Sequence, residues 1–235
     1  APPWWHLKKK KFLYADAFVS GDFARAIMQF TMPEPSGEKI KSWEKEFVDI
    51  YAYMQSIAPP KYPWPVDKRL AAAGKKVFEQ TCAECHGTYG ATGRYPNRVV
   101  PIEMIGTDSL RLTGLTKEFR SYYARSWFAQ DGVKVVTDPV GYLAPPLDGI
   151  WASAPYFHNG AVPTVYAVLT KEARPKYFRR AGTIKDYDTV NLGLKVEALT
   201  SPPPAGVPNE ARRRVINTTL AGLGNQGHPF GFHLT

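Results

Sequence analysis

The sequence predicts a mainly α-helical protein whose helices are separated by long loops rich in proline and glycine. Three observations support this fold class. Hydrophobic residues make up 44% of the 235 residues, which is enough for a packed core rather than a disordered chain. The 21 prolines and 19 glycines are spread along the chain instead of forming a repeat, as is typical of many loops. The clearest apolar periodicity, which follows Asp67, has the spacing of a helix.

The start of the helix after Asp67 marks the expected boundary between two parts of the chain. Asp67 is a suitable N-cap after the break at Pro63-Trp64-Pro65. Small and apolar residues then recur on one helical face, at Leu70, Ala73, Gly74, Val77, Phe78 and Thr81. We therefore expect a domain over residues 67–235, preceded by a helical N-terminal extension over residues 1–66.

Composition and charge narrow the classes of partner. The formal net charge of +9 and the pI of about 9.4 favour anionic partners. A solvated basic face is the alternative interpretation of the dense runs at Lys8–Lys11 and Arg212–Arg214. The sequence contains no helix-turn-helix or RNP pattern, so we do not expect nucleic acid as a partner. No apolar run approaches the roughly 18 residues of a transmembrane span, and Ala1–Trp5 lacks a signal-peptide pattern.

The only two cysteines lie in one short motif, Thr81-Cys82-Ala83-Glu84-Cys85-His86-Gly87. C-x-x-C-H is the attachment signature of a c-type haem. Two thiols three positions apart on one helical turn can reach the two porphyrin vinyl groups, and the histidine that follows can then ligate the iron. We expect one ring nitrogen of His86 to face the iron and the other to donate to a carbonyl that orients the ring.

Three other interpretations of the motif are weaker. A zinc site needs about four ligands, usually from paired C-x-x-C elements, and this chain has one such element. A thioredoxin-like redox pair requires a βαβ setting, which the sequence does not show. A disulfide across two intervening residues is strained and closes almost no loop. Haem attachment also predicts a periplasmic, cell-surface or secreted protein, because such thiols are joined to haem outside the cytoplasm.

Several stretches together resemble a known family. The matching segments are Thr81–Gly87, Tyr95–Asp108, Tyr142–Thr164, Arg174-Pro175 with Phe178, and Gly224–Gly231. They resemble the C-terminal haem domain of the bacterial di-haem cytochrome c peroxidase superfamily, closest to the rubber-oxygenase-like di-haem cytochromes. The stretch from Trp4 to Met32 is similar to the segment that links the two haem domains in that family. Gly74 with Phe78 resembles the first helix of cytochrome c domains, so the resemblance implies a cytochrome c-like fold.

The resemblance also implies site residues. It places a distal iron ligand in the glycine-rich loop near the C-terminus, which is His228 in this chain, and Met104 is the runner-up. His158 is expected to lie in the haem pocket. Tyr142 and Trp151 are expected to line the haem, although core packing would also explain them. The chain departs from di-haem members by having one C-x-x-C-H motif instead of two. This departure leaves any catalytic residue unassigned, because in the family the first haem is the usual site of oxygen or peroxide chemistry.

Two classes of function follow. The first is an electron-transfer module with one covalent, six-coordinate haem that exchanges electrons with a partner haem domain or an acidic redox protein. The second is a haem oxidoreductase of peroxidase or oxygenase type, in which this haem or a partner haem activates peroxide or dioxygen. We favour the module over a self-sufficient enzyme. The resemblance would allow a calcium ion between domains, but no sequence feature supports one.

Overall fold

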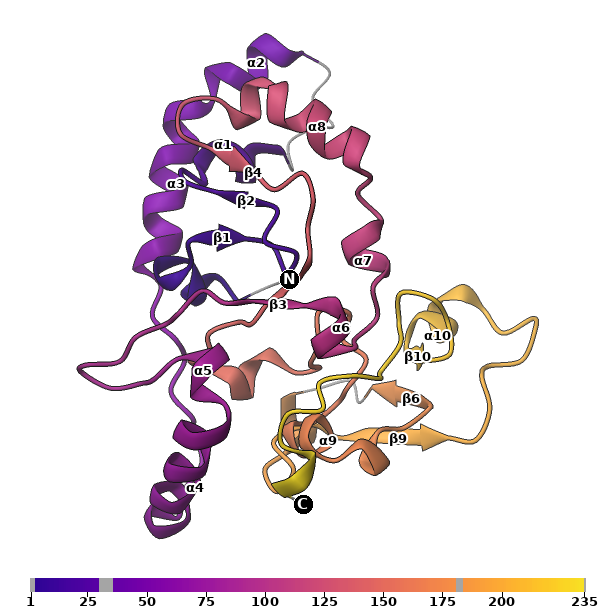
Figure 1. The fold of residues 1–235 in the computed structure, drawn as a ribbon. Helices are drawn as coiled ribbons and strands as arrows, with labels where there is room; N and C mark the ends of the chain where they lie inside the picture. Colours follow the sequence, from indigo (N-terminus) through magenta and orange to yellow (C-terminus); the bar gives the residue numbers. More distant parts are fainter. Residues whose placement is uncertain (1–2, 30–35, 181–183, 235) are drawn as a thin grey trace. The chain divides into compact units, whose positions relative to one another are not determined.

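The computed structural model describes residues 3–29, 36–180 and 184–234 (Figure 1). Met32, which ends the stretch that resembles an inter-domain segment, lies outside the described residues. The chain divides into two compact units, each assembled from segments that are far apart in the sequence. Unit 1 comprises residues 1–59, 84–101 and 112–148, and unit 2 comprises residues 60–83, 102–111 and 149–235. The domain boundary expected between residues 66 and 67 is a different division and stays a prediction.

Unit 1 contains a three-stranded antiparallel sheet accompanied by helices (Figure 1). The strands, in the order β1-β2-β4, are β1 (Phe12–Leu13), β2 (Val19–Ser20) and β4 (Lys134–Val135). The helices are η1 (Trp4–Lys9), α1 (Ala24–Met28), α2 (Gly37–Ser42), α3 (Glu44–Ser56), α8 (Lys117–Arg125) and η3 (Trp127–Ala129). Helix α3 packs against η1 and α1, and α8 packs against β4. The central strand is therefore covered, and Val19 is fully buried.

The core of unit 1 combines apolar packing with one buried ion pair. Its apolar members are Leu7, Leu13, Phe18, Val19, Phe23, Ala26, Met54, Tyr123 and Val133. Each large side chain among them contributes about 2 kcal/mol by leaving water. A guanidinium nitrogen of Arg120, which is fully buried, donates to the carboxylate of Asp16 at 2.6 Å. The same guanidinium also donates to three backbone carbonyls, so its buried charge is satisfied.

A second, two-stranded sheet in unit 1 leads directly to the candidate site. Strand β3 (Val99–Pro101) pairs antiparallel with β5 (Gly141–Leu143). The strands approach so closely at Gly141 that a Cβ atom there would lie 1.9 Å from the carbonyl oxygen of Val100. Strand β5 is followed at once by residues 144–148, here called the proline loop, which contains Pro145 and Pro146.

Unit 2 contains a three-stranded antiparallel sheet, a two-stranded hairpin and several short helices (Figure 1). The larger sheet has the order β10-β6-β9, formed by β10 (Val215–Asn217), β6 (Tyr177–Arg180) and β9 (Val196–Leu199). The hairpin pairs β7 (Tyr187–Asp188) with β8 (Gly193–Leu194). The helices are α4 (Lys68–Thr81), α6 (Ile102–Ile105), η4 (Ile150–Ser153), α9 (Val165–Leu169), η5 (Lys171–Ala173), η6 (Ile184–Asp186), α10 (Asn209–Arg213) and η7 (Phe232–Leu234). Two further short helices, α5 (Ala83–His86) and α7 (Leu110–Thr113), contain residues of both units.

The helix expected after Asp67 is confirmed. The Asp67 carboxylate accepts hydrogen bonds from the backbone N–H groups of Arg69 and Leu70 at 2.8 and 3.0 Å, so it caps α4. At 14 residues α4 is the longest described helix, and none of its residues is buried. Among the described residues, no helix has both the length and the apolar character needed to cross a bilayer.

The expectation of a mainly α-helical fold is wrong. The described part of the chain forms four small sheets, and two strands of the first sheet lie in the extension expected to be helical. Each strand spans only two to four residues, which is too short for an alternating pattern to stand out in the sequence. The strands form because distant segments meet, as when β2 pairs with β4, and propensity within one segment cannot report such pairing.

Candidate functional site

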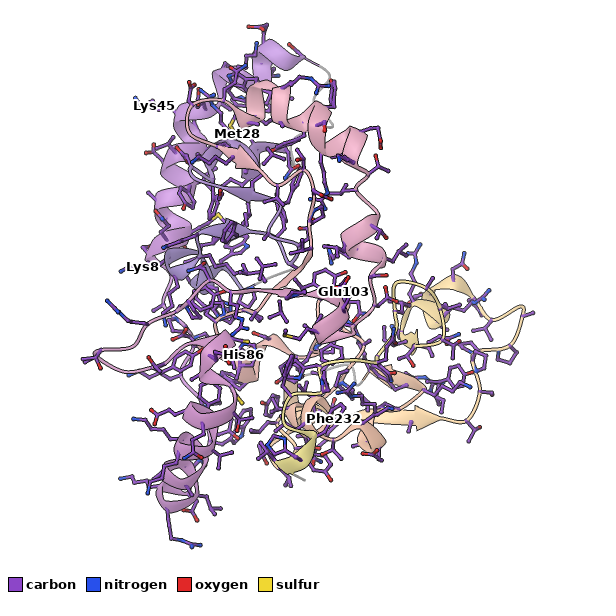
Figure 2. All side chains as sticks on the ribbon, in the orientation of Figure 1. Lys8, Met28, Lys45, His86, Glu103 and Phe232 are labelled. Carbon is purple, nitrogen blue, oxygen red and sulfur yellow. The ribbon has the colours of Figure 1, made fainter. Side chains whose placement is uncertain are left out.

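The C-x-x-C-H motif lies where α4 ends and the single turn of α5 begins. Cys82 is the C-cap of α4, and its backbone N–H donates to the carbonyl of Phe78 at 2.8 Å. Helix α5 then carries Cys85 and ends at His86 (Figure 2). The two cysteines are not joined in a disulfide. Burial raises the pKa of the Cys85 thiol, and the nearby guanidinium of Arg98 opposes that rise. The motif therefore presents two thiols and an imidazole at the junction of α4 and α5.

The imidazole of His86 is oriented by one backbone carbonyl. Its Nδ1 atom lies 2.8 Å from the carbonyl oxygen of Pro145 in the proline loop. A carbonyl can only accept, so Nδ1 carries the proton and Nε2 keeps its lone pair. Burial lowers the pKa of His86, and the hydrogen bond to Pro145 only partly opposes this shift. The ring is therefore neutral at pH 7, with Nε2 as its metal-binding atom.

The residue after His86 must be glycine. Gly87 has φ +83°, a left-handed backbone conformation that glycine adopts without strain. A Cβ atom there would lie 2.4 Å from the carbonyl oxygen of Arg94 and 2.9 Å from the Cα atom of Tyr95. The close approach lets the chain turn directly after His86 and return toward β3.

The far end of the proline loop is held at Asp148. The carbonyl oxygen of Asp148 accepts a hydrogen bond from Nε1 of Trp5 at 2.8 Å and lies 2.7 Å from Nε2 of His6. The Asp148 carboxylate forms an ion pair with Lys9 at 2.7 Å. Helix η1, from the start of the chain, thus anchors the loop that orients His86.

These residues fit a covalently attached haem. The motif supplies two cysteines at the required spacing, and the histidine is a neutral imidazole whose second nitrogen has a carbonyl acceptor. Such an acceptor fixes the orientation of a metal-bound histidine and raises its basicity. The sequence predicted an acceptor but could not name Pro145.

Two of the other expected site residues have clear structural partners. Tyr142 lies in β5 and is buried, and its hydroxyl accepts a hydrogen bond from the backbone N–H of Leu112 at 3.0 Å. Trp151 lies in η4 and donates from Nε1 to the carbonyl of Pro60 at 3.0 Å. These hydrogen bonds give both residues a structural role in the fold. Their expected role in lining the haem stays a prediction.

Trp151 belongs to an aromatic cluster of unit 2 that sequence reasoning missed. Trp64 stacks on Tyr187 with ring centroids 4.7 Å apart, and Trp151 meets both rings edge to face. The rings border a shallow hollow of about 430 Å³ lined by Pro63, Trp64, Trp151, Lys185 and Tyr187. The aromatic residues of the three contributing segments were visible in the sequence, but only the fold brings them together.

His158 is partly buried in unit 2, next to charged residues. Burial, with a smaller contribution from the charge of Arg111, lowers the pKa of His158 to about 4. A guanidinium nitrogen of Arg111 donates to the backbone carbonyl of His158 at 3.0 Å. His158 is therefore neutral at pH 7. Its expected role in the haem pocket is untested.

His228 lies in a strained backbone conformation. Its φ of +54° is in the left-handed region, which is uncommon for a residue other than glycine. The backbone N–H of His228 donates to the carbonyl of Ile105 at 2.6 Å. The preceding residue, Gly227, packs so tightly that a Cβ atom there would lie 2.4 Å from the backbone nitrogen of Thr107. Strain of this kind persists only where the surroundings hold it, and it is concentrated at functional sites.

Two charged side chains hold the loop that contains His228, residues 222–231, here called the distal loop. The Asp108 carboxylate accepts from the backbone N–H groups of Gly222 and Gly224 at 2.9 and 3.2 Å. Burial raises the pKa of Asp108, but hydrogen bonds from three backbone N–H groups outweigh this effect, so its pKa is lowered overall. Arg174 donates to the carbonyls of Asn225 and Gly227 at 2.7 and 2.9 Å.

The rest of the Arg174 side chain is also fully engaged. It donates to the carbonyls of Ala167 and Val168 in α9 at 2.7 and 2.8 Å. Its guanidinium also lies over the rings of Phe157 and Phe232, at 5.1 and 5.2 Å from their centroids. Arg174 therefore ties the distal loop to α9 and to two aromatic rings.

The expected site residues divide between the two units. His86, Cys85 and Tyr142 lie in unit 1, whereas Cys82, Met104, Trp151, His158 and His228 lie in unit 2. Met104, in α6, is 49% exposed. The assignment of His86 as proximal ligand, and of His228 or Met104 as distal ligand, stays a prediction. The anchoring roles of Asp108 and Arg174 were missed, because each depends on contacts with a distant part of the chain.

Comparison with known proteins agrees with the motif. Residues 141–179 match the family model described as RoxA-like, cytochrome c-like. This segment contains the whole of Tyr142–Thr164, one of the stretches that resemble rubber-oxygenase-like cytochromes. The match supports a rubber-oxygenase-like cytochrome c domain and implies haem c binding.

Two relatives come from Sinorhizobium fredii, and both are described as uncharacterized proteins. Protein y4iM is 31% identical over 171 residues, which covers 62% of this chain and 38% of y4iM. Protein y4iJ is 26% identical over 235 residues, which covers 74% of this chain and 37% of y4iJ. The chain thus spans less than two fifths of the length of these relatives.

Proposed function

We propose that this chain is a c-type cytochrome domain that transfers electrons through one covalent haem attached to Cys82 and Cys85 and ligated by His86. The observation that carries this proposal is the state of His86. Its ring follows C-x-x-C directly, is neutral at pH 7, and donates from Nδ1 to a backbone carbonyl. When bound, haem iron supplies a one-electron couple between ferric and ferrous states.

The protein residues have three roles in this proposal. The two thiols hold the porphyrin permanently, so the cofactor stays with the chain in both redox states. His86 presents Nε2 as ligand, while its Nδ1–H bond to Pro145 keeps the ring from rotating. A hydrogen-bonded neutral ligand also sets the potential through its basicity.

Covalent attachment can be tested directly. We expect the haem to stay with the polypeptide through acid-acetone extraction and the protein mass to exceed the sequence mass by one haem. Replacing both Cys82 and Cys85 with Ala should yield a chain from which haem is extracted. The control is His233→Ala, which changes an exposed residue outside the motif. Haem that is extractable while both thiols are intact would refute the proposal.

We further propose His228 as the distal ligand, with Met104 as the alternative. The strained backbone and the charged anchors of the distal loop support His228, because such strain is maintained where function requires it. The wild-type ferric iron should be low spin. His228→Ala should make it high spin, whereas Met104→Ala should leave it low spin. The reverse pattern would assign the ligand to Met104.

The spin state also distinguishes electron transfer from oxidoreductase chemistry. A high-spin wild-type iron would indicate an open position and favour the peroxidase- or oxygenase-type alternative, which the RoxA-like match supports. No residue is assigned a catalytic role in either case.

The setting of the domain is also a proposal. The family resemblance supports a C-terminal haem domain of a di-haem protein located in the periplasm, at the cell surface or in the secreted fraction. Its redox partner would be a second haem domain or a protein with an acidic docking surface, given the net charge of +9.

We expect electron-transfer rates with an acidic redox protein to fall as salt is raised, because charges are screened beyond about 10 Å at 0.1 M salt. A rate that does not depend on salt would remove charge from the docking argument.

A further inference from the structure

A tyrosine three residues after the proposed haem ligand makes two hydrogen bonds around that ligand. The Tyr89 hydroxyl donates to the backbone carbonyl of His86 at 2.9 Å. The same oxygen accepts from the backbone N–H of Leu147 at 2.7 Å. Tyr89 thus joins the backbone of the ligand to the proline loop, which also carries the acceptor for the ligand ring.

These contacts form a closed circuit within unit 1. It runs from the His86 ring to Pro145, along the chain to Leu147, through the Tyr89 hydroxyl, and back to the backbone of His86. The stretch between the Pro145 carbonyl and the Leu147 N–H is stiff, because Pro146 fixes its own φ and restricts the residue before it. Pro146 is also fully buried. The Tyr89 hydroxyl oxygen therefore links the His86 backbone to the loop that carries the Pro145 oxygen.

Other anchors of the proline loop bind it at Ala144 and Asp148. Tyr95 donates from its hydroxyl to the carbonyl of Ala144. Lys9 pairs with the Asp148 carboxylate, and its ammonium lies 5.1 Å from the centroid of the Tyr89 ring. Tyr89 differs from these residues because it contacts the loop and the backbone of His86 with one atom.

We propose that Tyr89 is a positioning residue for His86, holding the Pro145 carbonyl in register with the Nδ1–H of the ligand ring. The inference rests on the proposed haem attachment at residues 82–86. Without the hydroxyl, the loop can shift relative to the ligand backbone, and the Nδ1–H bond weakens. A weaker bond makes the imidazole a poorer electron donor to the iron, so the ferric state loses stabilisation and the midpoint potential rises.

The test compares three Tyr→Phe variants of the haem-loaded protein. Tyr89→Phe removes both hydrogen bonds, Tyr95→Phe removes the hydrogen bond to Ala144 of the proline loop, and Tyr122→Phe changes an exposed tyrosine of the same unit. The readouts are solvent exchange of the His86 Nδ1 proton by NMR in the ferrous state and the midpoint potential.

We expect Tyr89→Phe to speed this exchange by about five- to tenfold, as for the loss of one or two ordinary hydrogen bonds, and to raise the potential. Tyr95→Phe should change both readouts much less, and Tyr122→Phe should change neither. If the haem-loaded Tyr89→Phe and Tyr122→Phe variants have the same proton exchange rate and the same midpoint potential, the positioning role is overturned. A wild-type chain without covalent haem would instead refute the proposed function, so the two failures are distinguishable.

A second variant covers the case in which Tyr89→Phe does not accumulate with haem. Pro146→Ala loosens the stiff connection between the Pro145 carbonyl and the Leu147 N–H while leaving the Tyr89 hydroxyl in place. We expect faster exchange of the His86 Nδ1 proton in this variant, in the same direction as for Tyr89→Phe. Unchanged exchange in Pro146→Ala would then overturn the proposal.

Discussion

The two histidines proposed as iron ligands are held in different ways. His86 has an ordinary backbone, and its ring is oriented by one carbonyl in a loop anchored largely by neutral groups. His228 has a left-handed backbone, and its loop is anchored by a carboxylate and a guanidinium that bind backbone groups. The first arrangement constrains the ligand ring, whereas the second constrains the backbone that carries the ligand.

The difference follows from the local sequence. His86 lies at the end of a helical turn, so its backbone needs little further support, and one acceptor suffices to direct the ring. The distal loop has glycines at positions 222, 224, 227 and 231 and no helix to fix it before η7. Hydrogen bonds to charged groups are about twice as strong as neutral ones, and they replace the missing secondary structure. The comparison predicts a difference in stability between the two loops. Removing a charged anchor of the distal loop should lower the free energy of unfolding more than removing a hydroxyl anchor of the proline loop.

The largest effect is expected at Arg174. Arg174→Met keeps the apolar stem but leaves four backbone carbonyls without their donor, which should lower the free energy of unfolding by about 3 kcal/mol. Urea unfolding measures this. The control is Arg179→Met, an exposed residue in a surface ion pair, with an expected change of about 0.5 kcal/mol or less. A loss below about 1 kcal/mol for Arg174→Met would contradict charge anchoring of the loop.

A smaller effect is expected at Asp108. Asp108→Asn removes the charge and converts one acceptor oxygen to a donor, which opposes the N–H groups of either Leu110 or Gly222 and Gly224. We expect the free energy of unfolding, measured in urea, to fall by about 2 kcal/mol. The control variant Asp138→Asn, which lies outside this cluster, should have the same free energy of unfolding as the wild type. Equal stability of the two variants would show that the carboxylate is not an anchor.

Part of the pH dependence of the free energy of unfolding should come from His158. Its pKa is about 4 in the folded protein and near 6.5 when unfolded, so the unfolded chain binds the proton first as pH falls. The stabilising contribution is therefore complete above pH 6.5 and is lost as pH falls toward 4. After allowance for partial exposure, we expect a decrease of about 1 kcal/mol over this range.

The matched variants for this prediction are His158→Gln and His233→Gln. Unfolding measured at several pH values between 7 and 4 should show a flatter dependence for His158→Gln than for the wild type. His233 is exposed, so His233→Gln should follow the wild type. Parallel curves for all three proteins would rule out His158 as the source.

The smallest effect is expected for the ion pair between Lys9 and Asp148, which anchors the proline loop. Lys9 is 40% exposed, so Lys9→Met should cost about 0.5 kcal/mol or less at low salt. The difference from the wild type should vanish at high salt, where exposed charges are screened. A salt-independent loss would mean that Lys9 acts through packing, including its contact with the ring of Tyr89.

The features predicted well are those formed within one or two helical turns. The Asp67 cap and the helix after it depend on residues three or four positions apart, and the structure confirms both. The interpretation of C-x-x-C-H is equally local. The error in fold class arose where segments of two to four residues form strands only by pairing with distant partners.

The sequence by itself determined a helix that ends at two thiols and an imidazole, because spacing along one helical turn is encoded by consecutive residues. Only the tertiary structure decided which groups orient them. Pro145 lies 59 residues from His86, and Arg174 lies 53 residues from Gly227. A backbone carbonyl is present at every position of the chain, so side-chain pattern cannot identify which one serves as acceptor. That choice is made when distant segments pack together and satisfy the polar groups they bury.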